Sequence, residues 1–489
     1  MKKALAMVLA AAMLMGCLTG CGNKAEETQA ETKATEAVKT TEAAGGNDTT
    51  EAAAEEKEWF GTEDGKTVTI KFWGGIQPEY GYDVMVENFN EEYKDKGVQV
   101  EYTRFVNSTE GNLQLETYLM GGGEVDVFMN YGGRSQLDTR VESNMILDIS
   151  DRLEAYGFDP VEELGAASMA NFTYDDGSCY GFPTKYENSN WMLINVDMFE
   201  AAGVEIPYDG WSYSEFLAAL EKLTYGEGQD KVYGAHLTLS GLNAGLPGIL
   251  GSVLGGNRVY ANEEGTELNY DNEVYKEAFE MIMTGLDSGW IIPIEDEKSE
   301  TLTVANCFLA GKCAISTNVS QMRLCMDTAT YPHAFTTALV PGPVPDGEEY
   351  NTVEYRTHAQ VTGAGDTICI AKNTEYPDAC FEFIMWYVQG GMAPLAKGGR
   401  IPLWSGLDQS LVVDVLKENA GDAIDMTSIE KYLSIDNSKG VVEVNGYAAN
   451  EIKTMYLEEF EAMCFGRQTV DETIQNLMDR GQKLIDAAK

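Results

Sequence analysis

Three stretches of the sequence place aromatic side chains beside amide and carboxylate groups. They are Trp73-Gly74-Gly75, Asn130-Tyr131-Gly132-Gly133 and Tyr186-Glu187-Asn188-Ser189-Asn190-Trp191. A sugar needs that mixture, because flat aromatic faces cover its C–H patches and planar polar side chains hydrogen-bond its hydroxyls. Singly, each stretch could be surface polar residues next to a packed aromatic. Together they predict a carbohydrate-binding site.

The elements that would position these stretches are strands alternating with helices. The sequence predicts strands at 68–73, 98–102 and 125–129, with helices at 84–93 and 113–120 between them. Short connections in this order predict a parallel, doubly wound sheet with helices on both faces. Ligands bind such sheets at the loops beyond the carboxyl ends of the strands. The stretches after Phe72, Met129 and Phe182 meet that condition.

The alternation continues to the end of the chain. Further strands are predicted at 191–196 and 366–370, and further helices at 214–223, 275–285, 377–388, 450–463 and 470–487. Thr469 is placed to cap the last helix, with Glu472 at the capping-box position. The residues after position 58 are too many for one ordinary core, so we expect two lobes.

The N-terminus carries an export signal. Lys2 and Lys3 precede an apolar run, Ala4–Met15, which ends in small-residue junctions at Cys17 and Cys21. This pattern predicts a secretory signal peptide, and the run is too short to span a bilayer. Leu18-Thr19-Gly20-Cys21 resembles the bacterial lipobox, whose cysteine is diacylated and becomes the new N-terminus. We expect lipidation at Cys21, with Cys17 as the alternative.

The segment behind the lipobox has the composition of a tether. Residues 22–58 contain no aromatic residue and are dominated by Glu, Thr, Ala and Lys. Such a stretch cannot bury enough apolar surface to offset its chain entropy. We therefore expect a signal peptide at 1–20 and a disordered acidic tether at 21–58. The anchored chain would lie on the extracellular face of the cell membrane of a single-membrane bacterium.

Charge and metal-binding residue types limit the possible partners. A formal net charge of −45 argues against nucleic acid and polyanionic ligands. The seven cysteines after Cys21 show no Cys-x-x-Cys spacing, and the three histidines are widely separated. We expect no metal and no cofactor. An exported protein with unpaired thiols suggests a low-oxygen habitat, although a disulfide among the seven stays open.

Several motifs in their order resemble the extracellular solute-binding proteins of ABC sugar importers, the class that includes maltose-binding protein. The resemblance runs from about residue 66 to 484. Gly122–Phe128 is similar to the family's Gly-x-x-Pro-Asp-Val element, with Val125 in place of the proline. Tyr180–Thr184 resembles its Tyr-Gly-x-Pro crossover, and Phe308–Ile315 its Phe-x-x-Gly-Lys segment. Gly466–Glu472 is similar to the signature that opens its last helix.

The resemblance implies two doubly wound α/β lobes joined by a hinge, as in type II periplasmic binding proteins, with the ligand in the cleft between them. Lobe 1 would comprise 59–184 and 345–395, and lobe 2 would comprise 185–344 and 396–489. It also implies capture rather than catalysis, an ABC transporter permease as partner, and a monomer. The captured ligand would be a carbohydrate, and we expect an oligosaccharide.

The candidate ligand-binding residues extend the three stretches and add residues that the resemblance implies. They are Trp73, Gln77, Glu79, Tyr80, Asn130, Tyr131, Glu187, Asn190, Trp191, Asn243, Asn318, Arg400 and Trp404. Arg400 would offer a hydrogen-bonding fork and Trp404 a stacking face. Trp191 has a second interpretation as a core residue. Trp211 is left out because it resembles a packed aromatic at a helix start.

Other functions remain as alternatives. A membrane-anchored glycoside hydrolase would need a pair of carboxylates, which a chain with 79 acidic residues supplies anywhere. The sequence has no Gly-x-Ser-x-Gly elbow, His-Glu-x-x-His motif, Walker loop or EF-hand loop. A surface adhesin would need repeats, and none are visible. The same binding fold could also carry a non-sugar ligand.

Overall fold

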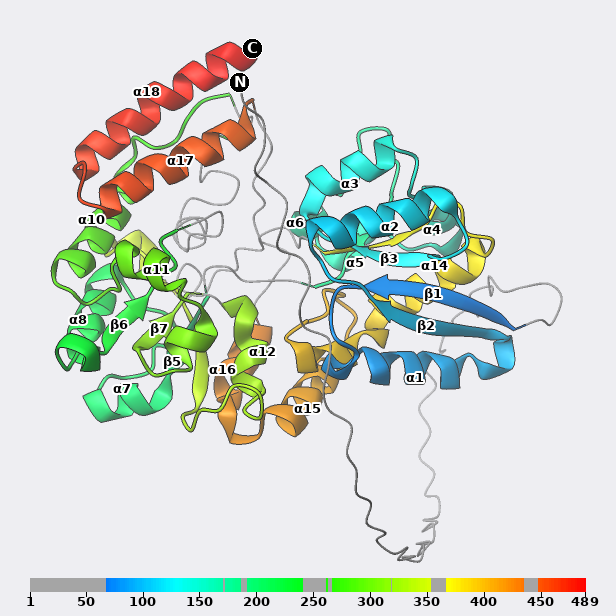
Figure 1. The fold of residues 1–489 in the computed structure, drawn as a ribbon, viewed down its shortest axis with the longest axis horizontal. Helices are drawn as coiled ribbons and strands as arrows, with labels where there is room; N and C mark the ends of the chain where they lie inside the picture. Colours follow the sequence, from blue (N-terminus) through cyan, green and yellow to red (C-terminus); the bar gives the residue numbers. More distant parts are fainter. Residues whose placement is uncertain are drawn as a thin grey trace, which may run out of the picture. The chain divides into compact units, whose positions relative to one another are not determined.

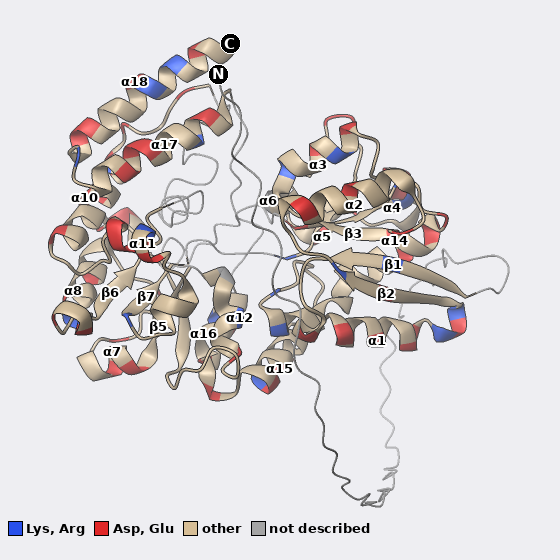
Figure 2. Ribbon diagram, viewed as in Figure 1, with Lys and Arg blue, Asp and Glu red and all other residues tan. Residues whose placement is uncertain are grey.

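Two β-sheets surrounded by helices make up the described parts of this mixed α/β chain (Figure 1). The computed structural model describes residues 67–169, 172–185, 191–240, 261–262, 266–317, 319–352, 366–434 and 447–489. The predicted signal peptide and tether lie outside these residues. Figure 2 shows Asp and Glu residues, in red, on most of the helices around both sheets.

The first sheet has five strands in the order β2-β1-β3-β9-β4. Their bounds are Val98–Arg104 for β2, Val68–Gly74 for β1, Val127–Asn130 for β3, Thr367–Ile370 for β9 and Phe182–Pro183 for β4. β1 pairs in parallel with β2 and β3, as predicted for this α/β alternation. β9 is antiparallel to β3 and β4. The predicted parallel arrangement of the first three strands is therefore confirmed, and the two antiparallel pairings come from β9, which arrives from far along the chain rather than through a βαβ unit.

The helices that accompany the first sheet are α1 to α6 and α14. Their bounds are Tyr82–Glu92, Thr109–Gly121, Gly133–Glu142, Ser150–Tyr156, Pro160–Leu164, Ala166–Met169 and Pro377–Trp386. α1 buries Tyr82, Met85 and Phe89, which lie on one helical face. Val84, the first residue of the helix that the sequence predicts, is 43% exposed because it lies about 100° around the helix from its neighbour Met85.

The second sheet has four strands in the order β6-β7-β5-β8. Their bounds are Tyr233–His236, Cys313–Ser316, Trp191–Asn195 and Thr337–Pro341. β6 and β7 are parallel, whereas β5 is antiparallel to β7 and β8. All five residues of β5 are buried. Met192 and Ile194 point to one core and Trp191 and Leu193 to another, so the period of two residues places a core on each face.

Helices from distant parts of the chain cover these two faces. The core of Met192 includes residues of α8, α10, α17 and α18, which span Tyr213–Leu223, Glu273–Asp287, Ala449–Cys464 and Val470–Ala488. The core of Trp191 includes residues of α12, α15 and α16, which span Met322–Met326, Gln409–Ala420 and Met426–Leu433. The longer of these helices each bury one apolar stripe, as expected for a surface helix, whereas the short helix α12 is buried along most of its length.

Shorter elements connect the longer ones. Two more described α-helices are α7 Val196–Ala202 and α11 Ile294–Glu300. The short 3-10 and π-helical segments are η1 Pro78–Tyr80, η2 Lys94–Lys96, η3 Gly228–Asp230, η4 Val304–Phe308, η5 Val319–Gln321, η6 Glu348–Tyr350, η7 Tyr387–Gly391, η8 Ala393–Gly398 and η9 Gly421–Ala423. Among the described residues, no helix combines the length and the apolar composition that crossing a membrane requires.

The seven cysteines after the signal are all buried free thiols. The sulfur atoms of Cys307 and Cys313 lie 3.6 Å apart, so these two thiols are in contact without a bond. Several others sit in apolar surroundings, where a thiol behaves as a small hydrophobe. Burial accordingly raises the pKa of Cys179 to about 11 and of Cys325 to about 12. The disulfide that the sequence left open is not present among them.

The predicted cap of the last helix is confirmed. The Thr469 hydroxyl accepts from the Glu472 amide at 3.2 Å, and the Glu472 carboxylate accepts from the Thr469 amide at 2.8 Å. Two amide groups at the start of α18 are thereby satisfied reciprocally.

Replacing this cap should destabilise the protein measurably. Thr469→Ala removes a side-chain acceptor, and we expect the free energy of unfolding to fall by about 1 kcal/mol in urea denaturation. Thr454→Ala is the control, since its exposed hydroxyl only donates to the carbonyl of Asn450 within α17. Equal losses of unfolding free energy in the two variants would show that the hydrogen bonds of the cap do not stabilise the protein.

Candidate functional site

The first two predicted stretches meet at one edge of the first sheet. The Tyr131 hydroxyl accepts from the Gly75 amide at 2.7 Å, and the Tyr102 hydroxyl donates to the Ile76 carbonyl at 2.7 Å. A Cβ at Gly74 would lie 2.7 Å from the Tyr102 hydroxyl oxygen, and one at Gly75 would lie 3.0 Å from the Tyr131 ring. Glycine is therefore required at both positions for the loop after β1 to approach these rings.

The other residues of the first stretch differ in exposure. Trp73 is 8% exposed and packs edge-on against Tyr118, with 5.2 Å between ring centroids. Gln77 and Tyr80 are half-buried, and Glu79 is exposed. The Tyr80 hydroxyl donates to the Asp327 carboxylate at 3.1 Å. Tyr80 thus links the loop after β1 to the residue that follows α12.

Asn130 has a partner that sequence reasoning did not identify. Its side chain is fully buried, and Oδ1 accepts from Arg140 Nη1 at 2.6 Å. Arg140 is itself buried and also binds Asn112 and Glu116. Within the described part of the chain, Nδ2 of Asn130 has no acceptor. The amino group of Asn130 is therefore buried without an acceptor at the carboxyl end of β3, on a side chain that Arg140 fixes in place.

Arg400 lies in a buried ionic cluster. Its Nη1 donates to Asp366 Oδ2 at 2.6 Å, and the Lys185 ammonium lies 3.8 Å from the same oxygen. The three side chains are 8%, 15% and 13% exposed, so they form a cluster largely shielded from water. One nitrogen of the guanidinium is thus committed to Asp366. The predicted fork is only partly available to a ligand.

The cluster remains ionised despite its burial. Burial favours the neutral form of Asp366, but Arg400 and Lys185 outweigh it and hold the pKa of Asp366 below its ordinary value of 3.8. Burial likewise opposes the charge of Arg400, yet Asp366 and the nearby phenols of Tyr82 and Tyr131 raise the pKa of Arg400 well above its usual range. The edge of the sheet therefore carries fixed charges at all physiological pH values.

Asp366 and Lys185 were missed because of strand direction. Asp366 directly precedes β9, and the expected parallel sheet would have placed it at the far edge. Since β9 is antiparallel to β3, the start of β9 lies at the carboxyl ends of β1 and β3. Lys185 follows β4 and bridges to Pro402, which brings its side chain to the same place. No local sequence signal distinguished either residue.

The structure places two predicted site residues elsewhere. Trp191 is 1% exposed and packs edge-on against Tyr432 at 5.0 Å between centroids, so its ring belongs to a core. Its place in a strand buried on both faces explains this. Trp404 donates from Nε1 to Glu163 at 2.8 Å and lines a groove beside α15. Four predicted residues lie outside the described part of the chain: Glu187, Asn190, Asn243 and Asn318.

Trp211 was left out of the candidate site because the sequence predicts that it packs at a helix start. Trp211 is 3% exposed and donates from Nε1 to the Pro341 carbonyl at 2.9 Å, so it is the packed aromatic that the sequence predicted. In the described ranges, no group of three or more His, Cys, Asp and Glu side chains is arranged to hold a metal ion. The residues at the sheet edge offer hydrogen bonding, aromatic contact and fixed charge.

The Asp366 cluster yields a prediction about stability. Asp366→Asn leaves the buried Arg400 without its counter-ion, and we expect the free energy of unfolding at pH 7 to fall by about 3–5 kcal/mol. Asp378→Asn is the matched control, because Asp378 pairs with Arg152 at an exposed position and should cost about 0–1 kcal/mol. The measurement is chemical denaturation of both variants.

The pH dependence follows from the lowered pKa of Asp366. A carboxylate whose folded pKa is depressed stabilises the protein above its unfolded pKa, and this contribution is lost as pH falls through the folded value. The difference in the free energy of unfolding between wild type and Asp366→Asn should therefore be constant above about pH 5, and it should become smaller below pH 3.8. A difference that persists unchanged in acid would contradict the ionised cluster.

Comparison with known proteins gives a consistent picture. Residues 84–413 match the family described as bacterial extracellular solute-binding protein. No curated protein matches the chain in sequence. Among solved structures, the chain is similar to an ABC substrate-binding protein from Listeria monocytogenes in complex with cycloalternan, at 20% identity and a TM-score of 0.62. That similarity covers 86% of this chain and 100% of the other.

Two further structures share the fold. A sugar transporter from Rhizobium etli in an open conformation is 21% identical with a TM-score of 0.61, covering 86% of this chain and 100% of that one. The sugar-binding protein MalE from Xanthomonas citri is 16% identical with a TM-score of 0.57, covering 86% and 98%. The fold is thus that of the maltose-binding-protein type. With more than half of its residues matched, the chain belongs to the bacterial extracellular solute-binding protein family.

Proposed function

We propose that this protein is a lipid-anchored extracellular solute-binding protein that captures a carbohydrate, an oligosaccharide by preference, and delivers it to an ABC transporter permease. The observation that carries the proposal is the sheet edge where Gly75 meets Tyr131 and Arg400 meets Asp366. It combines aromatic rings with fixed polar groups, which is the combination that sugar recognition needs. Family membership supplies the transport context.

The related structures support a sugar rather than an anion. The Listeria protein holds cycloalternan, and the Rhizobium and Xanthomonas proteins are described as a sugar transporter and a sugar-binding protein. The net charge of −45 also disfavours anionic ligands. Substrate-binding proteins are not enzymes, and we propose the same for this chain. A membrane-anchored glycoside hydrolase is the alternative.

We propose that the ligand lies between two lobes. Lobe 1 would comprise 59–184 and 345–395, and lobe 2 would comprise 185–344 and 396–489. The first sheet takes its strands from the first set of segments and the second sheet from the second set. Closure would move the lobes as nearly rigid bodies about the connecting segments. Each sheet has its own core, which favours motion as units.

The proposed ligand contacts come from both sides of this cleft. Lobe 1 would contribute Trp73, Gln77, Glu79, Tyr80, Asn130 and Tyr131, and the other contacts would come from Glu187, Asn190, Asn243, Asn318 and Arg400. Gln77 is half-buried and Glu79 is exposed, whereas the amino group of Asn130 is buried and has no acceptor among the described residues. Trp191 and Trp404 are not part of this proposal, because one is in a core and the other lines a separate groove.

A thermal-shift screen against mono- and oligosaccharides tests the function. A ligand that binds only the folded protein raises the melting temperature in a concentration-dependent manner. The sugar should be recovered intact after long incubation. Release of new reducing ends at a catalytic rate would favour the hydrolase instead, and no shift with any sugar would favour a non-sugar ligand.

Trp73 provides a mutational test once a sugar is identified. Trp73→Ala should weaken binding by about 1–3 kcal/mol through lost aromatic contact. Trp290→Ala, in the half-buried periphery of the second sheet's core, is the control for removal of an indole. Calorimetry on folded protein measures both. An affinity equal to wild type in Trp73→Ala would remove this residue from the site. Glu187→Ala should also weaken binding if that carboxylate accepts sugar hydroxyls.

The lipid anchor is tested by substitution in living cells. Cys21→Ala should abolish incorporation of radiolabelled palmitate and release the protein into the medium, whereas Cys17→Ala should leave both unchanged. The reverse result would assign the lipid to Cys17. If the wild-type protein incorporates no palmitate and is found in the medium, the lipid anchor is contradicted and the N-terminus is an ordinary cleaved signal peptide.

A further inference from the structure

Two of the buried cysteines lie side by side where η4 meets the second sheet. Cys307 is part of η4, and Cys313 is the first residue of β7. Their sulfur atoms lie 3.6 Å apart, which is the separation of two thiols in contact. The carbohydrate site proposed above uses neither residue.

Main-chain hydrogen bonds hold both cysteines in place. The Cys307 amide donates to the Thr303 carbonyl at 3.0 Å, and the Cys307 carbonyl accepts from the Lys312 amide at 3.0 Å. Cys313 lies opposite Tyr233 in the parallel pairing of β7 with β6, and the Tyr233 amide donates to the Lys312 carbonyl at 2.9 Å. The positions of the two cysteines are therefore set by a helical turn on one side and by a sheet on the other.

The turn between the two cysteines is equally well defined. The Gly311 amide donates to the Phe308 carbonyl at 2.9 Å. Gly311 has a φ of +73°, a conformation that residues with a side chain rarely adopt. This turn returns the chain from η4 directly to the start of β7, so that Cys307 and Cys313 face each other.

The surroundings of the pair are apolar, and the two thiols interact with each other. Both cysteines are 0% exposed and belong to the same core as Trp191 and Leu339. The hydrogen bond from the Cys313 thiol lowers the pKa of Cys307 below its ordinary value of 9.0. Burial raises the pKa of Cys313 well above that value. Cys307 is therefore the sulfur that more readily becomes a thiolate, which is the nucleophilic form.

The sulfur atoms of other cysteines contact oxygen atoms instead. Cys179 and Cys369 each donate to a main-chain carbonyl, at 3.7 and 3.9 Å, and Cys380 contacts the hydroxyl of Thr374 at 3.6 Å. A disulfide bond requires a sulfur–sulfur distance of about 2.05 Å and main chains that are already close. Within the described part of the chain, the pair in η4 and β7 is the one whose sulfurs are in contact.

We propose that Cys307 and Cys313 are a disulfide site, whose thiols become linked when the chain folds in the presence of a low-molecular-weight disulfide. The Cys307 thiolate attacks one sulfur of that compound, so a mixed disulfide forms and one thiolate leaves. Cys313 then gives its proton to that thiolate and attacks the sulfur of Cys307, and the second thiolate leaves. Two electrons pass from the protein to the compound, which is reduced to two thiols.

The reaction takes place before the pair is buried, or while the segment from Thr303 to Cys313 is locally open. In the folded protein neither sulfur reaches solvent, and a fully buried thiol does not react with an outside oxidant. Local opening exposes such groups without global unfolding. Once the bond has formed, the folded arrangement favours it, because the same two side chains are brought together in either form. The site does not depend on carbohydrate binding.

Oxidised glutathione is the test probe, and it is applied to the full-length protein by two routes. In the first, reduced protein is unfolded in urea and diluted into a glutathione buffer, and the folded fraction is isolated by size-exclusion chromatography. In the second, native protein is incubated in the same buffer with urea below the unfolding transition, which promotes local opening. Free thiols are then blocked with iodoacetamide. Among the cysteines after Cys21, the number of blocked thiols should fall by two, from seven to five.

Trypsin identifies the linked pair, because it cleaves after Lys312, between the two cysteines. The disulfide should join peptide 299–312 to peptide 313–323, and reduction should release the two peptides. The linked peptides in folded protein from either route would support the site. Folded protein in which Cys307 and Cys313 are both blocked by iodoacetamide after both routes would overturn it, and so would a link from Cys307 to a different cysteine.

Two substitutions show whether contact decides the pairing. In Cys307→Ala, all six remaining thiols after Cys21 should be blocked by iodoacetamide, because Cys313 has lost its partner. Cys464→Ala is the matched control, since Cys464 is also a buried free thiol but lies in a different core. The control should keep the linked peptides in the same yield as wild type. A new link from Cys313 to another cysteine in Cys307→Ala, or loss of the link in the control, would overturn the assignment.

Discussion

The buried contact between Arg400 and Asp366 is the constraint on which the candidate site depends. It joins the residue directly before β9 to the segment that follows η8, more than thirty positions along the chain. A buried ion pair is costly to form, so its contribution is mainly to position rather than to net stability. With Lys185 on the same oxygen, the pair fixes three separate segments at one edge of the first sheet.

The loops at that edge are then arranged by close packing. The loop after β1 is held by two tyrosines, Tyr131 from the loop after β3 and Tyr102 from β2. The hydroxyl of each forms a hydrogen bond with the main chain of that loop. The hydroxyls make these bonds, while the rings pack against other aromatic side chains: Tyr102 stacks on Tyr82 with 4.4 Å between ring centroids, and Tyr131 lies 5.9 Å from Phe105. Because Gly74 and Gly75 have no side chains, the rings can lie against the main chain, and the loop needs no other support. A rigid edge of this kind loses little entropy when a ligand binds.

The sequence predicted the local elements well and the long-range pairing poorly. Strand β1, helix α1 and the cap at Thr469 follow from periodicity and local chemistry, and the structure confirms them. The direction of β9 and the partners of Arg400 depend on where the chain returns to the first sheet, and no local pattern encodes that. Trp191 illustrates the limit of local patterns, because it ends one of the three predicted stretches and also begins a predicted strand. The sequence left both interpretations open, and the strand is buried on both faces.

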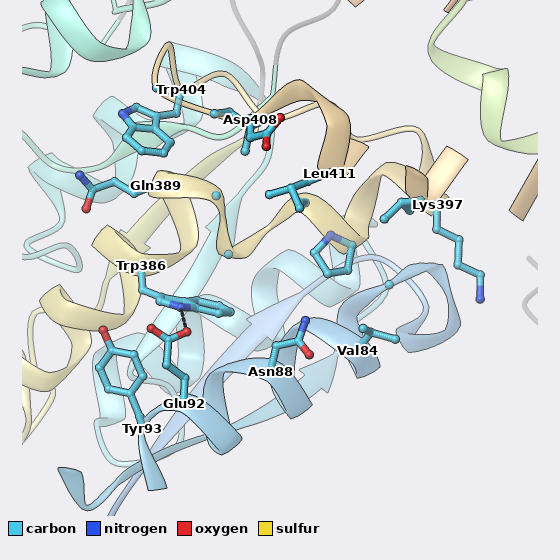
Figure 3. Close-up of a pocket in the computed structure, with 18 of the residues that line it drawn as sticks. Val84, Asn88, Glu92, Tyr93, Trp386, Gln389, Lys397, Trp404, Asp408 and Leu411 are labelled. Carbon is cyan, nitrogen blue, oxygen red and sulfur yellow. Dashed lines mark hydrogen bonds between the residues drawn. The ribbon is translucent and has the colours of Figure 1, made fainter. Parts of the chain in front are cut away.

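The segment from η8 to Trp404 connects the edge of the first sheet, where Arg400 lies, to the groove that Trp404 lines beside α15 (Figure 3). A Cβ at Gly81 would lie 2.2 Å from the Pro394 carbonyl, so the start of α1 rests directly on η8. The same short stretch then places Arg400 in the ionic cluster and Trp404 in the groove wall. Within this segment Arg400 is held by Asp366, and Trp404 at its end is held by Glu163. Since the sheet edge and the groove share one anchored segment, a displacement of that segment would move side chains in both of them.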